Sequence, residues 1–171
     1  PDMHTLVRDQ NMAKEEFLNQ VKLCLQWVND LNLPCVPAIR FVHTFLDDHP
    51  DFMKELMTVL DRPALVEVWD ERFFYFVAKF ELNFIDNAGK AACLSTVQID
   101  VENCERFGIT YVAEDASKCT PLLLHTSVSG SVDRNVYALL EHQAREMTKG
   151  QKAEWPTWLA PTQVRLLPVA P

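Results

Sequence analysis

Glycine is scarce in this chain, at 4 of 171 residues, or about 2% where about 7% is usual. The four glycines, Gly89, Gly108, Gly130 and Gly150, form neither GxGxxG nor GxxxxGK[ST]. Both motifs use glycines to bring the backbone close to phosphates. Nucleotide binding through a glycine-rich loop is therefore excluded.

Paired cysteines and long apolar runs are also missing. The 5 cysteines are widely spaced and include no CxxC, which fits neither a disulfide framework nor a zinc ribbon. No apolar run approaches the roughly 18 residues of a membrane span, and no signal peptide opens the chain. We therefore expect free thiols, a cytoplasmic setting and no membrane partner.

Basic residues are outnumbered, with 16 Lys and Arg against 24 Asp and Glu and a net charge of −8. This balance argues against a domain whose main task is to neutralise nucleic-acid phosphates, so any polyanion must meet a local basic site. Hydrophobic residues at 48% and charged residues at 23% are typical of a globular chain with a real core. A length of 171 residues predicts one domain, or one domain with a short extension.

The pattern along the chain predicts an α+β fold, an antiparallel sheet flanked by helices. Residues Asp86 to Gly89 have the composition of a tight turn between two strands, which predicts an antiparallel hairpin. Ser131 is a candidate N-cap for a late helix. We expect helices at residues 13–31, 50–60 and 131–149, and strands at 38–42, 64–69, 72–84, 92–100, 109–113 and 122–128.

Both ends of the chain indicate a piece of a longer polypeptide. The sequence opens at Pro1, without an initiator Met, and a segment of alternating apolar residues begins within three residues. Residues 155–161 contain two prolines and predict a linker. Residues 162–169 predict the first strand of a unit that continues past Pro171.

The strand at 72–84 has two distinct faces. Alternate phenylalanines from Phe74 predict a core face, whereas Tyr75 and Lys79 share the other. Gln98 lies on the neighbouring strand, so these three polar side chains either converge on a small ligand or form a solvated sheet face.

Two further groups of residues have the chemistry of a site. His4 and His125 lie on predicted strands and are either core histidines or part of a zinc site, which typically takes three protein ligands. Arg134 lies in the first turn of the late helix, after Ser131. It either binds an anion such as phosphate at the helix start or pairs with a neighbouring acid.

Taken together, several segments resemble threonyl-tRNA synthetase in its archaeal form. They are residues 2–4, 95–100, 105–107 with 110–112, 125–134 and 158–164. The resemblance covers essentially the whole chain in order. It implies a class II synthetase catalytic domain in residues 1–154, from just after motif 2 through motif 3. Residues 155–171 then lead to an anticodon-binding domain that is absent here.

The resemblance also implies a role for each candidate in the amino-acid site. His4 and His125 match two of the three zinc ligands, and zinc in that family binds the amino and hydroxyl groups of threonine. Valine, which lacks the hydroxyl, is thereby rejected. Asp2 matches the carboxylate that accepts the hydroxyl, and Tyr75 and Gln98 match residues beside threonine and the adenylate.

Catalytic roles are implied for Arg134, the motif 3 arginine placed on ATP, and for Lys79. Ser131 and Gln98 join Arg134 around ATP, which is used with Mg²⁺. The family's third zinc ligand, a cysteine, is absent, as are the motif 2 arginine and motif 1 with most of the dimer interface. We therefore expect the isolated chain to bind zinc weakly and to be inactive.

The expected function of the parent is that of a homodimeric ligase that uses ATP to join threonine to tRNA(Thr). The acidic balance implies that tRNA is held mainly by regions outside this chain. One alternative is a catalytically inactive synthetase-like module for binding or assembly. Another is a class II synthetase for a different amino acid, such as proline or serine.

Overall fold

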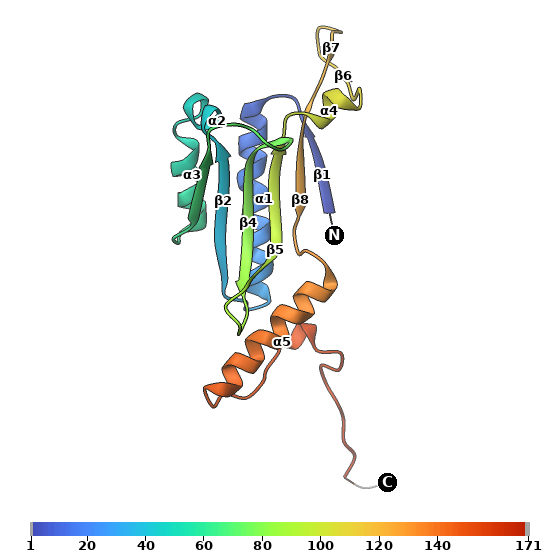
Figure 1. Cartoon of the computed structure of the whole chain (residues 1–171). Helices are drawn as coiled ribbons and strands as arrows, with labels where there is room; N and C mark the ends of the chain where they lie inside the picture. The colour runs from blue at the N-terminus through green and yellow to red at the C-terminus, as the bar shows by residue number, and fades with distance from the viewer. Residues whose placement is uncertain (1, 170–171) are drawn as a thin grey trace.

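A computed structural model describes residues 2–169 of the chain (Figure 1). One six-stranded sheet, in the order β1-β8-β5-β4-β2-β3, forms its centre, and β6 and β7 form a separate ribbon. The strands are β1 (Asp2–Val7), β2 (Cys35–Val42), β3 (Leu65–Trp69), β4 (Phe76–Ile85), β5 (Ala91–Asp100), β6 (Tyr111–Val112), β7 (Lys118–Cys119) and β8 (Leu122–Ser127). The helices are α1 (Gln10–Asp30), α2 (His43–Asp48), α3 (Phe52–Leu60), α4 (Asn103–Arg106) and α5 (Val132–Thr148), followed by a 3₁₀ turn at Thr157–Leu159.

Helices α1 and α3 lie against one face of the sheet, and α5 crosses its lower end (Figure 1). The strands are antiparallel except β2 and β3, which are parallel and are connected through α2 and α3. The helix-covered face holds the core, to which β4 contributes Ala78, Phe80, Leu82 and Phe84. Alternate residues on the opposite face are half-exposed, and the candidate site forms there.

Local chemistry explains where the two long helices begin. Asp9 caps α1, because its carboxylate accepts the Met12 N–H at 2.8 Å. The apolar stripe through Val21, Leu25 and Val28 is buried as its period predicts. Ser131 caps α5 by accepting the Arg134 N–H at 3.2 Å, so the predicted N-cap is confirmed.

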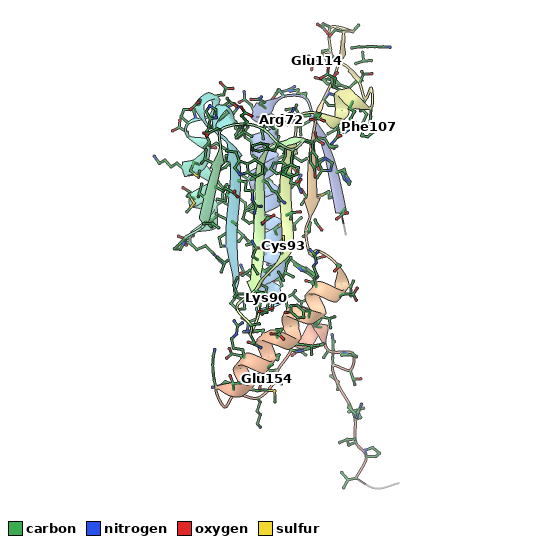
Figure 2. All side chains as sticks on the ribbon, in the orientation of Figure 1. Arg72, Lys90, Cys93, Phe107, Glu114 and Glu154 are labelled. Atoms are coloured by element: carbon green, nitrogen blue, oxygen red, sulfur yellow. The ribbon has the colours of Figure 1, made fainter. Side chains whose placement is uncertain are left out.

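The predicted hairpin between β4 and β5 is confirmed, but the strand expected at 72–84 begins only at Phe76. Arg72, labelled at the upper end of the sheet in Figure 2, donates to the Phe74 carbonyl at 2.7 Å and to the Glu102 carboxylate at 2.7 Å. These bonds hold residues 72–75 outside the sheet. The prediction that Phe74 lies on the core face is wrong, because its side chain is 55% exposed.

Residues 162–169 adopt no strand in the part of the chain that the structure describes, and that they begin a further unit stays a prediction. Val164 and Leu166 are almost fully exposed, and the segment extends away from α5 (Figure 1). A strand requires a neighbour to bond its backbone groups, and no strand between residues 2 and 169 pairs with this segment. Within residues 2–169, no helix has the length and apolar character to cross a membrane.

Candidate functional site

Six polar residues, one from each strand of the six-stranded sheet, form a continuous row across its open face. Each is the register partner of the next, through antiparallel pairs from β1 to β2 and a parallel pair from β2 to β3. We call this set the cross-sheet row: His4, His125, Gln98, Lys79, Arg40 and Glu67. Side chains directly opposite on adjacent strands are close enough to interact. The row therefore brings together four predicted site residues that are far apart in the sequence.

His4 and His125 are direct neighbours at one end of the cross-sheet row. Their ring centroids are 4.9 Å apart and their planes meet at 86°. The Nε2 atom of His125 lies 2.6 Å from the Oδ2 atom of Asp100, the last residue of β5. Asp100 is not among the site residues predicted from the sequence, because its contact with His125 depends on the pairing of β5 with β8.

Asp100 is held by several donors in a buried position. Its side chain is 0% exposed, and it accepts the backbone N–H groups of Glu102 at 2.8 Å and Asn103 at 2.9 Å. It also accepts the side-chain amide of Asn103 at 2.6 Å. Burial opposes ionisation, but the donors from Asn103, His125 and Glu102 outweigh it and lower the pKa of Asp100.

A hollow of about 230 Å³ adjoins the histidine pair. Tyr75 donates its hydroxyl to Gln98 Oε1 at 2.6 Å, and its ring centroid lies 5.2 Å from that of His125. Burial, followed by the Asp100 charge, raises the pKa of Tyr75, which keeps the hydroxyl a donor. The lining consists of Asp2, His4, Tyr75, Thr96, Gln98, His125, Thr126 and Ser127. All the residues predicted to contact the amino acid therefore meet at one hollow.

The other half of the cross-sheet row is an ion-pair network. Lys79 Nζ lies 2.7 Å from Glu81 Oε1, and Arg40 approaches the same oxygen at 2.8 Å. Arg40 Nε also lies 2.7 Å from Glu67. A second hollow of about 550 Å³ opens here beside Trp69 and shares Tyr75 and Gln98 with the first. Sequence reasoning missed Arg40 and Glu67 because their roles depend on strand pairing.

Arg134 and Ser131 lie apart from both hollows, at the start of α5. Arg134 NH1 donates to the Cys93 carbonyl at 3.0 Å, and Cys93 marks the part of β5 nearest this helix start in Figure 2. Gly130 precedes Ser131 with φ +70°, and a Cβ there would lie 2.4 Å from the Leu94 carbonyl oxygen. Only glycine can bring this loop so close to β5.

Asn135 anchors the same loop from inside the protein. It is 8% exposed and donates to the carbonyls of Ser129 at 2.6 Å and Ser131 at 2.8 Å. It also accepts the Trp27 indole N–H from α1 at 3.1 Å. No local pattern predicts this role, because Trp27, the partner of Asn135 on α1, is 108 positions away along the chain.

The imidazole nitrogens of the histidine pair are ligands of the kind that zinc prefers. Catalytic zinc typically takes three protein ligands and leaves one position open. His4 and His125 offer two nitrogens side by side, and residues 2–169 contain no group of three His, Cys, Asp or Glu side chains that could hold a metal ion. A zinc ion held here would need its third ligand from outside these residues.

Comparison with known proteins gives a consistent set of relatives, although no family model matches the chain. It is 51% identical over 99% of its length to threonine–tRNA ligase from Pyrococcus furiosus, and 48% identical over 99% to that of Methanothrix thermoacetophila. In each case it spans 28% of the relative.

Solved structures agree at the level of the fold. The RNA-binding domain of threonyl-tRNA synthetase from Cryptosporidium parvum has a TM-score of 0.65 at 17% identity, over 84% of this chain and 37% of that one. Apo histidyl-tRNA synthetase from S. aureus has a TM-score of 0.61 at 13% identity, over 82% and 39%. The chain thus shares its fold with aminoacyl-tRNA synthetase chains and, over nearly all its length, is homologous to a segment of threonine–tRNA ligases.

Proposed function

We propose that residues 1–154 are part of the class II catalytic domain of a threonine–tRNA ligase, and that residues 155–171 lead towards an anticodon-binding domain. The observation that supports this most directly is the cross-sheet row, with the histidine pair and Gln98 beside one hollow. The identity of about 50% to threonine–tRNA ligases supports the choice of amino acid.

Threonine binds in the 230 Å³ hollow. Asp2 accepts the threonine hydroxyl proton in a hydrogen bond, while Tyr75 and Gln98 orient the remaining polar groups. His4 and His125 would hold zinc with a third ligand from elsewhere in the intact protein. When bound, zinc would supply a Lewis acid for the amino and hydroxyl groups of threonine. Valine leaves this site unsatisfied and is rejected.

Activation of threonine takes place between the hollow and the start of α5. The threonine carboxylate attacks the α-phosphorus of ATP, a new P–O bond forms, and pyrophosphate leaves with Mg²⁺. Arg134 exchanges its bond to the Cys93 carbonyl for ATP and offsets the charge that develops on phosphate oxygens. Ser131 and Gln98 bind ATP alongside it, and Lys79 contributes its charge from the cross-sheet row.

The terminal ribose of tRNA(Thr) then attacks the threonyl carbonyl, an ester forms, and AMP leaves. The net charge of −8 favours a phosphate-binding surface that lies mostly in regions outside this chain. The intact protein is a homodimer in this proposal, as the family resemblance implies.

A hybrid enzyme tests this function. Residues 1–171 replace the matching 28% of the Pyrococcus furiosus ligase. The rest of that ligase would supply the third zinc ligand and the motif 2 arginine that the family resemblance implies. We expect threonine-dependent ATP–pyrophosphate exchange, with a loss of at least about 100-fold in an Arg134→Ala hybrid. Lys152→Ala, an exposed residue beyond α5, is the matched control. A folded hybrid without exchange would instead favour the inactive binding module.

A further inference from the structure

The contact between Asp100 and His125 defines the chemistry of one histidine in the pair. A neutral imidazole carries its proton on one nitrogen and accepts at the other. His125 Nε2 lies 2.6 Å from Asp100 Oδ2, which is its only hydrogen-bond partner among residues 2–169. The state of Asp100 therefore decides which His125 nitrogen carries the proton.

The surroundings of Asp100 favour an ionised carboxylate, which acts only as an acceptor. One of its oxygens accepts two backbone N–H groups, from Glu102 and Asn103. The other accepts the Asn103 side-chain amide at 2.6 Å and faces His125 Nε2. Three N–H groups that can only donate therefore surround the carboxylate, and hydrogen bonds of this kind favour its ionised form. An ionised, acceptor-only carboxylate requires the proton to be on His125 Nε2.

The arrangement is rigid because it is built from backbone and buried groups. The Asp100 side chain is 0% exposed. The two backbone donors belong to the turn that begins α4, so the carboxylate cannot rotate without breaking them. His125 itself is fixed in register between His4 and Gln98.

We infer that Asp100 is a positioning residue that holds His125 in the Nε2–H tautomer, with Nδ1 left as a free lone pair. In many metal sites, a carboxylate orients a histidine in this way and increases its basicity. The lone pair gives His125 a nitrogen that can bind zinc without first losing a proton. Only this use of the lone pair depends on the proposed function, because the tautomer is a property of the chain itself.

The tautomer can be measured directly on the 171-residue chain labelled with ¹⁵N. Long-range ¹H–¹⁵N correlation separates the protonated from the unprotonated ring nitrogen. We expect His125 to show a protonated Nε2 and an unprotonated Nδ1. A protonated Nδ1 in the unaltered protein would overturn the inference without need of any variant.

Asp100→Asn provides the sharper test, because the amide keeps an oxygen for the backbone donors and presents N–H₂ to His125, while the Asn103 amide turns its own oxygen towards this group. The tautomer should then reverse, with Nε2 accepting and Nδ1 protonated. Asp47→Asn, at an exposed position on α2, should leave His125 unchanged. A folded Asp100→Asn protein with the original tautomer would contradict the assignment.

Titration with Zn²⁺ alone separates this inference from the proposed function. We expect Zn²⁺ to shift His125 Nδ1 and the His4 ring together, with affinity at least about 10-fold weaker in Asp100→Asn. Reversal of the tautomer without any Zn²⁺ response would preserve the role of Asp100 and count against the metal part of the proposed function. A Zn²⁺ response of equal affinity in both proteins would overturn the positioning role.

Discussion

Glu81 Oε1 lies 2.7 Å from Lys79 Nζ on the same face of β4, so the lysine expected to act in catalysis is already paired. Arg40 approaches the same oxygen at 2.8 Å. The Glu81 side chain is only 12% exposed, so solvent screens these pairs weakly. The charge available from the middle of the cross-sheet row therefore depends on one carboxylate that two cations share.

Glu81→Gln should destabilise the protein in a pH-dependent way. Burial tends to raise the pKa of Glu81, but Lys79 and Arg40 outweigh it and hold the pKa below its ordinary value of 4.5. A lowered carboxylate pKa adds stability above the unfolded-state pKa, and this contribution disappears as pH falls through the folded-state pKa.

We expect urea unfolding to show a loss of about 1–3 kcal/mol at pH 7 for Glu81→Gln. The difference from the unaltered protein should narrow as pH falls below about 4.5. Glu15→Gln, at an exposed site on α1, is the control. A difference that stays constant down to pH 3 would show that Glu81 does not titrate in this environment.

Gly130→Ala should damage the loop that places Ser131 and Arg134. The new Cβ would meet the Leu94 carbonyl oxygen at 2.4 Å, and φ is +70°. We expect a loss of more than about 2 kcal/mol. Gly89→Ala is the matched control, because Gly89 has φ +77° with nothing within 4 Å of the new Cβ. Equal losses in the two variants would show that backbone strain alone, and not contact with β5, explains the effect.

Asn135→Ala should loosen the same loop from its buried side. The change removes two donors to carbonyls and the acceptor for the Trp27 N–H. We expect a loss of about 2–3 kcal/mol and altered tryptophan fluorescence, measured during urea unfolding. Asn19→Ala, at an exposed site on α1, should change stability by less than about 0.5 kcal/mol. Unchanged fluorescence and stability in Asn135→Ala would contradict the anchoring role.

Four of the five thiols should be slow to react in the folded protein at pH 8. Burial raises the pKa of Cys24 and Cys35 to about 12 and that of Cys93 to about 11, and it also raises the pKa of Cys104. The thiolate is the reactive form. We expect a chromogenic disulfide reagent to label the half-buried Cys119 first and all 5 cysteines in urea. Rapid labelling of Cys24 without urea would contradict the core packing.

Local signals in the sequence were enough to predict the long helices and the central hairpin. The Ser131 cap and the apolar stripe of α1 depend on neighbours within a few residues. The Asp100 contact depends on the pairing of β5 with β8, 25 positions away. The segment at 162–169 has the composition of a strand but no partner within the described residues, and composition alone could not show this.

Discrimination between threonine and valine tests the central claim most directly. It is measured as the ratio of kcat/KM in ATP–pyrophosphate exchange by the hybrid enzyme, with and without His125→Ala. A site that binds the hydroxyl should favour threonine by about 10⁴-fold or more, and His125→Ala should remove most of that preference. Equal use of both amino acids, or a preference that survives His125→Ala, would contradict the assignment of threonine to the cross-sheet row.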